Sequence, residues 1–369
     1  MSFIKIHYMK KRVLFIGSYI DNATDGQNLK TKTYLDLFAE EGIDFIFVNT
    51  SNWKKRPFSI YFQLKKNIKK VDIIFLMVSF RGSRTLIPLI NSLNRNKKPF
   101  IYSMVGTGPL APHIRKIGPE KGMRFVNEHE YGKFKDRFLK KELKKLNYIL
   151  PETVTIAELY KDFYDLNNCY VVTNFRKVQP IKTTNDKSKC RKLVFLSRIV
   201  SEKGVFDIIE GFKNAQNKTN KRLSLDIYGK MGLSKDEELR FKKELTTEIK
   251  YCGAASFENV LDTISKYDLF CFPTKCPQEG APGVLVEAIL AGVPILSSNF
   301  PQAKDLLKDR QNCLLYRFTD VNDLENKLIE IVENDFLYKK LLDGVKESQS
   351  VFEYKQNKEL LFKILFENV

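Results

Sequence analysis

Two glutamates stand eight positions apart in the segment PQEGAPGVLVEAILAGVPIL, which covers residues 277–296. Glu279 precedes a loop of small residues, and Glu287 lies within an otherwise apolar run. A buried carboxylate is costly unless a charged partner or a ligand pairs with it. Glu287 therefore needs either a partner within the protein or a ligand.

The residues between the two glutamates predict the start of a helix. The letters GAPG at 280–283 mark a loop, and Gly283 allows a close approach of the backbone to a ligand. The helix VLVEAILAG then ends at Gly292. Free N–H groups at its start can hold a diphosphate, while Glu287, one turn later, accepts hydrogen bonds from a nearby diol. The plain alternative is an exposed loop carboxylate at 279 and a dipole-stabilising residue at 287.

Two cations follow a predicted buried strand in the segment FLSRIVSEKG, residues 195–204. Arg198 and Lys203 at the carboxyl end of a strand suit a doubly charged phosphate group, Arg by its fork and Lys as a point charge. The alternative is a pair of solvated surface cations with Glu202 as a local salt-bridge partner.

A third loop, GSYIDNATDGQNLKTKTYLDLF, leads from a strand at 12–17 into a helix that starts near Gly26. A helix start preceded by glycine can approach an anion through backbone N–H groups. The loop contains neither GxGxxG nor GxxxxGK[ST], so neither a dinucleotide site nor a P-loop is supported. An ordinary turn explains this loop equally well.

Short β-rich runs alternate with helical patterns along the whole chain, which is typical of parallel α/β architecture. Expected strands cover 12–17, 43–49, 71–79, 99–105, 147–152, 169–174, 192–197, 222–229, 248–253, 268–274, 293–298 and 312–316. We expect two Rossmann-like domains, over 1–176 and 192–350, joined by a polar linker over 177–191, with a terminal helical segment over 351–369. Ligands of such sheets bind at the carboxyl ends of the strands.

Composition narrows the class of protein. The net charge is +18 over 369 residues, and it is unevenly distributed: residues 1–180 hold 32 Lys and Arg against 16 Asp and Glu, whereas residues 181–369 hold 30 against 28. A basic N-terminal half suits an anionic partner or a solvated lysine-rich surface. The six cysteines form no CxxC pair, and no apolar run reaches the roughly 20 residues that span a bilayer. We therefore expect a cytoplasmic protein with reduced thiols.

The spacing Glu279-x7-Glu287 within EGAPGVLVEAILAGVPIL closely resembles the E-x7-E element of the retaining GT-B glycosyltransferases of family four, also called glycosyl transferases group 1. The segments SRIVSEKG, DIYG and YDLFCFPT precede it in the order typical of that family, so the resemblance covers about 190–330. The N-terminal half fits more loosely, through RVLFIG, GQNLKT and VVTNF. The resemblance implies two Rossmann-like domains facing across a cleft, with a C-terminal helix that returns to the first domain.

The resemblance implies catalytic roles for three residues. Arg198 and Lys203 would neutralise the diphosphate of a nucleotide-sugar and stabilise the leaving group. Glu279 would bind hydroxyls of the transferred sugar and hold its anomeric carbon against the acceptor.

It also implies a set of donor-binding residues. The backbone amides of Gly283, Val284 and Leu285 would hold the diphosphate at the helix start. Glu287 would accept hydrogen bonds from the ribose hydroxyls, and Gly26 would let the N-terminal loop close over the phosphates.

The family implies retention of configuration without a metal or a cofactor. No Asp-x-Asp occurs, and the nearest acidic pair, within Glu128-His129-Glu130, is interpreted as a surface cluster. Many members carry a histidine after the strand that corresponds to PFIYSMV, where this chain has Val105-Gly106-Thr107-Gly108. Either His113 replaces it on the acceptor side, or the departing phosphate deprotonates the acceptor.

The resemblance implies that the basic N-terminal half binds the acceptor. KKRPFSIYFQLKKNIKK (54–70) and KFKDRFLKKELKKLN (133–147) interleave lysines with apolar residues, as interfacial helices do. We therefore expect a UDP-sugar-dependent transferase of surface polysaccharide biosynthesis, with a lipid-linked or glycan acceptor and peripheral association with the inner face of the cell membrane. Two alternatives remain: a catalytically silent nucleotide-sugar-binding subunit, and a nucleic-acid-binding protein, for which no module is present.

Overall fold

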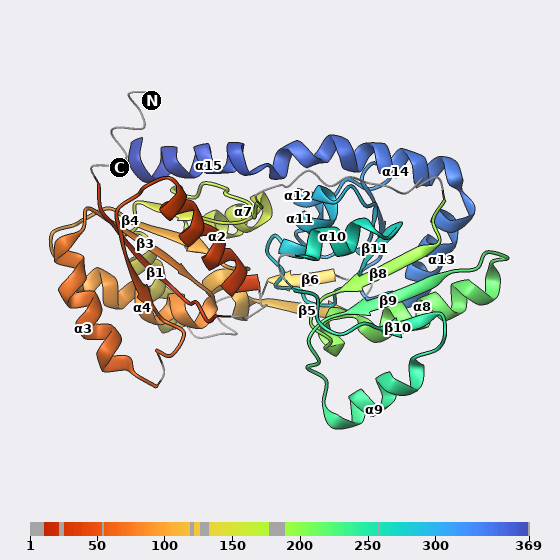
Figure 1. Cartoon of the computed structure of the whole chain (residues 1–369). Helices are drawn as coiled ribbons and strands as arrows, with labels where there is room; N and C mark the ends of the chain where they lie inside the picture. Colours follow the sequence, from red (N-terminus) through yellow and green to blue (C-terminus); the bar gives the residue numbers. More distant parts are fainter. Residues whose placement is uncertain are drawn as a thin grey trace. The chain divides into compact units, whose positions relative to one another are not determined.

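The computed structural model describes residues 11–21, 26–53, 55–118, 122–125, 133–176, 189–256 and 259–367. It divides into two compact units (Figure 1). Unit 1 consists of Met1–Arg115, Phe125–Asn174 and Lys355–Val369, and unit 2 consists of Lys116–Arg124 and Phe175–Tyr354. Most of the predicted linker, 177–188, lies outside the described residues.

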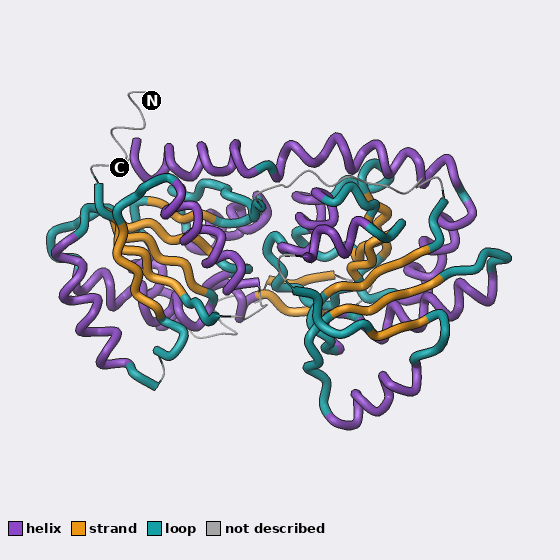
Figure 2. The backbone as a smooth tube through the Cα atoms, viewed as in Figure 1, coloured by secondary structure: helices purple, strands orange, loops and turns teal. Residues whose placement is uncertain are grey.

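Unit 1 is built on a five-stranded sheet in the order β2-β1-β3-β4-β7. All of its neighbouring strands run parallel, and Figure 2 shows them as orange segments beside purple helices. The strands are β1 (Val13–Gly17), β2 (Phe45–Asn49), β3 (Ile73–Val78), β4 (Phe100–Met104) and β7 (Tyr148–Leu150). Continuous apolar runs form β1 and β3, and β4 is apolar except for Ser103. Every residue of these three strands is buried, as expected for a parallel sheet covered on both faces.

The strand expected at 169–174 does not form. The segment starts a ladder beside β7, because Ile149 N–H donates to Asn168 O at 3.0 Å and Tyr170 N–H donates to Ile149 O at 2.9 Å. The next donor on the β7 side would be residue 151, which is a proline and has no N–H. Only an isolated bridge between Ile149 and Cys169 results.

Helices connect the strands of unit 1, and the end of the chain joins its core. The helices are α2 (Gly26–Glu40), α3 (Pro57–Asn67), α4 (Phe80–Leu93), α6 (Lys133–Leu143) and α7 (Val154–Tyr164). The terminal helix α15 (Tyr354–Phe362) continues as η6 (Lys363–Glu367). Lys358 Nζ lies 2.8 Å from a carboxylate oxygen of Glu41, and the ring of Phe362 packs against that of Phe38.

Smaller elements complete this part of the chain. They are η1 (Ile68–Lys70), η2 (Gly108–His113), and the two-stranded sheet of β5 (Ile114–Gly118) and β6 (Gly122–Phe125). The sequence did not predict β5 and β6, since neither segment has an alternating apolar pattern.

Unit 2 contains a six-stranded sheet in the order β10-β9-β8-β11-β12-β13, again parallel throughout. The strands are β8 (Lys192–Leu196), β9 (Ser224–Tyr228), β10 (Ile249–Tyr251), β11 (Leu269–Phe272), β12 (Ile295–Ser298) and β13 (Cys313–Tyr316). Numbered along the chain, the strands lie in the order 3-2-1-4-5-6, which is the order of a doubly wound sheet. The chain adds β9 and β10 on one side of β8 and then β11, β12 and β13 on the other, so the strand order reverses between β8 and β11. The loops after β8 and β11 therefore flank the point where such sheets bind ligands.

Two apolar layers cover the sheet of unit 2. Successive residues of β8 point to opposite faces, so Leu193 and Phe195 belong to one core and Val194 belongs to the other. The helices are α8 (Val205–Lys218), α9 (Lys235–Glu244), α10 (Val260–Ser265), α11 (Gly283–Leu290), α12 (Ala303–Leu306), α13 (Val321–Glu333) and α14 (Asp335–Ser348), with the single turns η3 (Ser201–Lys203) and η5 (Gln349–Phe352). Residues of α8, α13 and α14 line the first core, and those of α10, α11 and α12 line the second.

Candidate functional site

The loops that follow β8 and β11 touch one another at the point where the strand order reverses. Gly204 has a φ of +76°, and a Cβ built on it would lie 1.8 Å from the carbonyl oxygen of Pro273. The Lys275 N–H donates to Glu202 O at 2.9 Å. Only glycine fits this crossing, which brings the loop containing Lys203 against the loop containing Glu279.

Lys203 and Glu279 form an ion pair at this crossing. Their side chains are only 15% and 10% exposed. Thr274 Oγ1 donates to the same Glu279 oxygen at 2.8 Å, and Ser298 Oγ in turn donates to Thr274 O at 2.7 Å. The carboxylate is thus oriented by a residue beyond β11 and a residue of β12, and Lys203 supplies a positive charge beside it.

Cys276 lies within the same loop. Its N–H donates to Thr274 Oγ1 at 3.1 Å. Burial, with the nearby Glu279 charge, raises the pKa of the Cys276 thiol to about 12. The side chain is therefore protonated at neutral pH and is not a thiolate nucleophile.

Glu287 has a partner that the sequence did not reveal. Arg176 Nε donates to Glu287 Oε1 at 2.8 Å, and both side chains are almost wholly buried, at 6% and 5% exposed. Burial raises the pKa of Glu287, and the Arg176 guanidinium opposes that rise. The ion pair accounts for a carboxylate inside an apolar helix.

The N-terminus of α11 offers backbone donors. Pro282 occupies the N-cap, and no described side chain caps the helix. Leu285 N–H donates to Pro282 O at 3.0 Å, so this amide, expected to bind a diphosphate, is already engaged. Within the described part of the chain, the N–H groups of Gly283 and Val284 have no acceptor. Two amides at an uncapped helix start are well suited to an anion.

Arg198, the other predicted cation, lies in the loop after β8. Its side chain is exposed, and no ion pair to it occurs among the described residues. It is therefore free to meet an anion that approaches from solvent. Lys203, in contrast, is paired with Glu279. Of the two cations expected to act together, one is therefore exposed without an ion-pair partner among the described residues and the other is in an ion pair.

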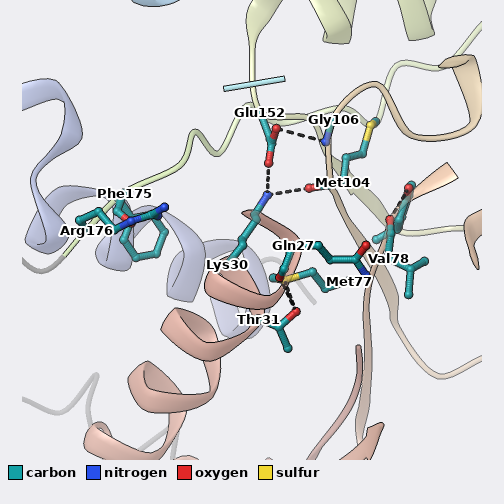
Figure 3. Close-up of polar contacts among 11 residues, drawn as sticks. Gln27, Lys30, Thr31, Met77, Val78, Met104, Gly106, Glu152, Phe175 and Arg176 are labelled. Carbon is teal, nitrogen blue, oxygen red and sulfur yellow. Dashed lines mark hydrogen bonds and ion pairs between the residues drawn. The ribbon is translucent and has the colours of Figure 1, made fainter. Parts of the chain in front are cut away.

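Unit 1 contains a second buried ion pair that the sequence missed. Lys30 Nζ lies 2.7 Å from Glu152 Oε1 and donates to Met104 O at 2.6 Å, while the Gly106 N–H donates to Glu152 Oε2 at 3.3 Å (Figure 3). Lys30 is 1% exposed and Glu152 is 3% exposed. The pair fixes the loop after β4, the loop in which the expected histidine is absent.

A signal for Lys30 was present in the sequence. On α2 the buried residues include Lys30, Tyr34, Leu37 and Phe38, at the i, i+4, i+7, i+8 spacing of one helix face. A lysine on the buried face of a helix indicates a buried carboxylate partner. No such signal marks Arg176, whose partner stands 111 residues further along the chain.

The remaining candidates are placed as follows. Gly26 is the first residue of α2 and is exposed, and no described atom would lie within 4 Å of a Cβ there. His113 ends η2, and its side chain lies outside the described part of the structure. The segment Glu128-His129-Glu130 also lies outside it. Within the described residues, no group of three or more His, Cys, Asp or Glu side chains is arranged to hold a metal ion.

The crossing at Gly204 can be tested against a matched glycine. Gly253 has the same φ of +76°, but no described atom lies within 4 Å of a Cβ placed on it. We expect Gly253→Ala to incur only the left-handed backbone strain, about 1–2 kcal/mol, and Gly204→Ala to cost about 1–3 kcal/mol more through steric overlap. Urea unfolding of both variants measures the difference, and equal losses of stability would contradict the described crossing.

Comparison with known proteins gives a consistent result. The family model for glycosyl transferases group 1 matches residues 178–348. An uncharacterized glycosyltransferase of Methanocaldococcus jannaschii is 25% identical over 317 residues, covering 79% of this chain and 76% of that protein. The GalNAc-alpha-(1->4)-GalNAc-alpha-(1->3)-diNAcBac-PP-undecaprenol alpha-1,4-N-acetyl-D-galactosaminyltransferase of Campylobacter jejuni is 22% identical over 326 residues, 83% of this chain and 87% of that protein.

A solved structure shares the fold. HepE of Anabaena, crystallised with UDP, superposes with a TM-score of 0.71 at 12% sequence identity, covering 96% of this chain and 99% of HepE. At this identity the likeness concerns the fold. The expected class of two parallel α/β units is confirmed by both the sheet topology and this neighbour.

Proposed function

We propose that this chain, a glycosyltransferase whose residues 178–348 belong to the glycosyl transferases group 1 family, transfers a sugar from a nucleoside diphosphate sugar to a lipid-linked or glycan acceptor. One observation carries the proposal. Lys203 and Glu279, an ion pair whose side chains are 15% and 10% exposed, lie where the strand order of unit 2 reverses. In the same unit α11 presents two amides that have no acceptor among the described residues, one turn before Glu287.

The donor site follows from these groups. The diphosphate lies at the start of α11, with Lys203 and Arg198 neutralising its charge. Glu287 accepts hydrogen bonds from the ribose, and Glu279 accepts them from the transferred sugar. Because UDP is present in the HepE structure, we take a UDP-sugar as the preferred donor.

For sugar transfer, the charged groups Lys203 and Glu279 exchange their partners. Lys203 moves from Glu279 to the diphosphate, and a sugar hydroxyl replaces it on the carboxylate. The acceptor oxygen bonds to the anomeric carbon as the carbon–oxygen bond to the diphosphate breaks. The electron pair leaves with the diphosphate, which also takes the hydroxyl proton. Cations that meet the charge developing on the leaving group lower the barrier, and we propose that the reaction retains configuration and needs no metal.

A panel assay tests the proposal. Purified protein is incubated with UDP-, GDP- or ADP-sugars and a polyprenyl-diphosphate-linked oligosaccharide, and release of free nucleotide and product mass are measured. We expect turnover with at least one UDP-sugar. Tight UDP binding with no turnover on any acceptor would instead support the alternative of a silent donor-binding subunit.

We further propose that unit 1 attaches to an anionic membrane surface through α3. Phe58 and Phe62 stand one turn apart on this helix and are 77% and 63% exposed. Exposed lysines follow at Lys65, Lys66, Lys69 and Lys70. Exposed aromatic residues beside cations are typical of interfacial helices. We propose that this association is peripheral and on the cytoplasmic face of the membrane. No described helix is long and apolar enough to cross a bilayer.

Vesicle flotation tests this attachment. We expect wild-type protein to float with vesicles that contain anionic lipid, and Phe58→Ser/Phe62→Ser to lower the bound fraction at least about tenfold, since two phenylalanines lose their burial in lipid. Phe336→Ser is the matched control, because Phe336 is 81% exposed on α14 of unit 2. Equal flotation of all three proteins, or binding that does not depend on anionic lipid, would refute α3 as the contact.

A further inference from the structure

Arg176 has more hydrogen-bonding capacity than its described contacts use. Its Nε donates to Glu287 and its Nη1 donates to the Phe175 carbonyl oxygen at 3.0 Å. Within the described part of the chain, Nη2 has no acceptor. The residue is only 5% exposed. Nη2 itself is not one of the buried side-chain atoms that lack a partner, so it keeps contact with solvent and an anion can reach it. A charged donor at the edge of a buried guanidinium suits an anionic ligand.

The unused Nη2 lies at the start of α11. A Cβ built on Gly283 would lie 2.2 Å from Arg176 Nη2. The Cα–Cβ direction of a helical residue tilts toward the helix N-terminus, so Nη2 lies on the side of Gly283 where the free amides emerge. Any side chain at 283 would push the guanidinium away. The glycine therefore makes room for Arg176 as well as for a ligand.

We propose that Arg176 is a donor-positioning residue whose Nη2 binds the phosphate next to the ribose while Nε stays on Glu287. This inference rests on the proposed donor site. The guanidinium spans Glu287, proposed to hold the ribose, and Gly283, proposed to meet the diphosphate. A planar fork that joins a carboxylate to an anion suits arginine and not lysine. Arg176 thus couples recognition of the ribose to recognition of its phosphate.

A ligand series separates this role from a merely structural one. UDP, UMP and uridine are titrated against the full-length protein, with Arg176→Gln as the test variant. We expect Arg176→Gln to bind UDP and UMP about 10- to 100-fold more weakly, as for the loss of a charge-assisted hydrogen bond. Uridine, which has no phosphate, should lose less affinity than UDP and UMP, because it is affected only through the loss of the Arg176 Nε–Glu287 ion pair. If Arg176 acted only by holding Glu287 in place, uridine would lose affinity to the same degree.

Two further variants secure the result. Arg176→Lys keeps a positive charge beside Glu287 and so preserves folding, yet it cannot reach both sites; we expect it also to weaken UMP and spare uridine. Arg191→Gln is the control, since Arg191 bonds to backbone carbonyls of Cys190 and Val332 elsewhere in unit 2. It should bind all three ligands as wild type does.

The possible outcomes are distinguishable. If wild-type protein binds no UDP, the proposed donor site itself fails. If wild type binds UDP but Arg176→Gln and Arg176→Lys bind UMP as tightly or more tightly, the donor site stands and the inference is overturned. In that case Arg176 would block the start of α11 until the donor displaces it.

Discussion

Glu279→Gln and Lys203→Met each lower the rate of sugar transfer about 100- to 1,000-fold, the loss typical of removing one preorganised group that stabilises transition-state charge. Lys203 is expected to meet the negative charge that develops on the leaving diphosphate. Glu279 is expected to hold the sugar so that the anomeric carbon faces the acceptor. Steady-state turnover with the best UDP-sugar from the panel measures both effects.

The double variant and a control sharpen this expectation. Because the two residues act as a unit, Glu279→Gln/Lys203→Met should lose little more activity than either single variant. Lys242→Met is the control, since Lys242 is an exposed lysine that pairs with Glu238 on α9, and it should retain full activity. Wild-type rates in both single variants would refute the site assignment.

Lys30→Met destabilises unit 1 by about 3–5 kcal/mol, the usual cost of leaving one member of a buried ion pair without its partner. Glu152, at 3% exposure, would lose its cationic partner, and Met104 O would lose its donor. The single tryptophan, Trp53, lies in unit 1. Urea unfolding followed by tryptophan fluorescence therefore reports on this unit alone.

Two companion variants test the cause. Lys30→Met/Glu152→Leu should regain much of the lost stability, because a buried ion pair replaced by apolar residues is often neutral. Lys144→Met removes one partner of an exposed pair with Asp165 and should leave the unfolding midpoint unchanged. A Lys30→Met midpoint equal to that of Lys144→Met would show that the buried pair does not stabilise unit 1.

Much of the fold could be predicted from local pattern. Eleven of the twelve expected strands contain an observed strand, since buried parallel strands are short apolar runs between turn signals. The twelfth, at 169–174, failed because ladder formation depends on the partner strand, and Pro151 of that partner lacks an N–H. The alternation of strand and helix patterns resumes after the polar linker at 177–191, and this predicted two separate sheets.

The sequence predicted those parts of the candidate site whose residues lie close together along the chain. Glu279, Gly283 and Glu287 lie in one continuous segment, so their spacing carried the signal. The Lys203–Glu279 contact joins loops 76 positions apart, and Arg176 reaches Glu287 across 111. Such contacts depend on strand order, which a single sequence does not specify. The roles assigned to these residues stay predictions.

Hydrogen exchange with and without UDP tests the central claim most directly. We predict that UDP slows exchange in peptides that cover 196–204 and 276–292, because the diphosphate occupies the free N–H groups of Gly283 and Val284 and orders the loop of Lys203. Peptides of α3 in unit 1 should not change. Unaltered exchange across both segments at saturating UDP, or protection confined to other parts of the chain, would contradict the proposed donor site.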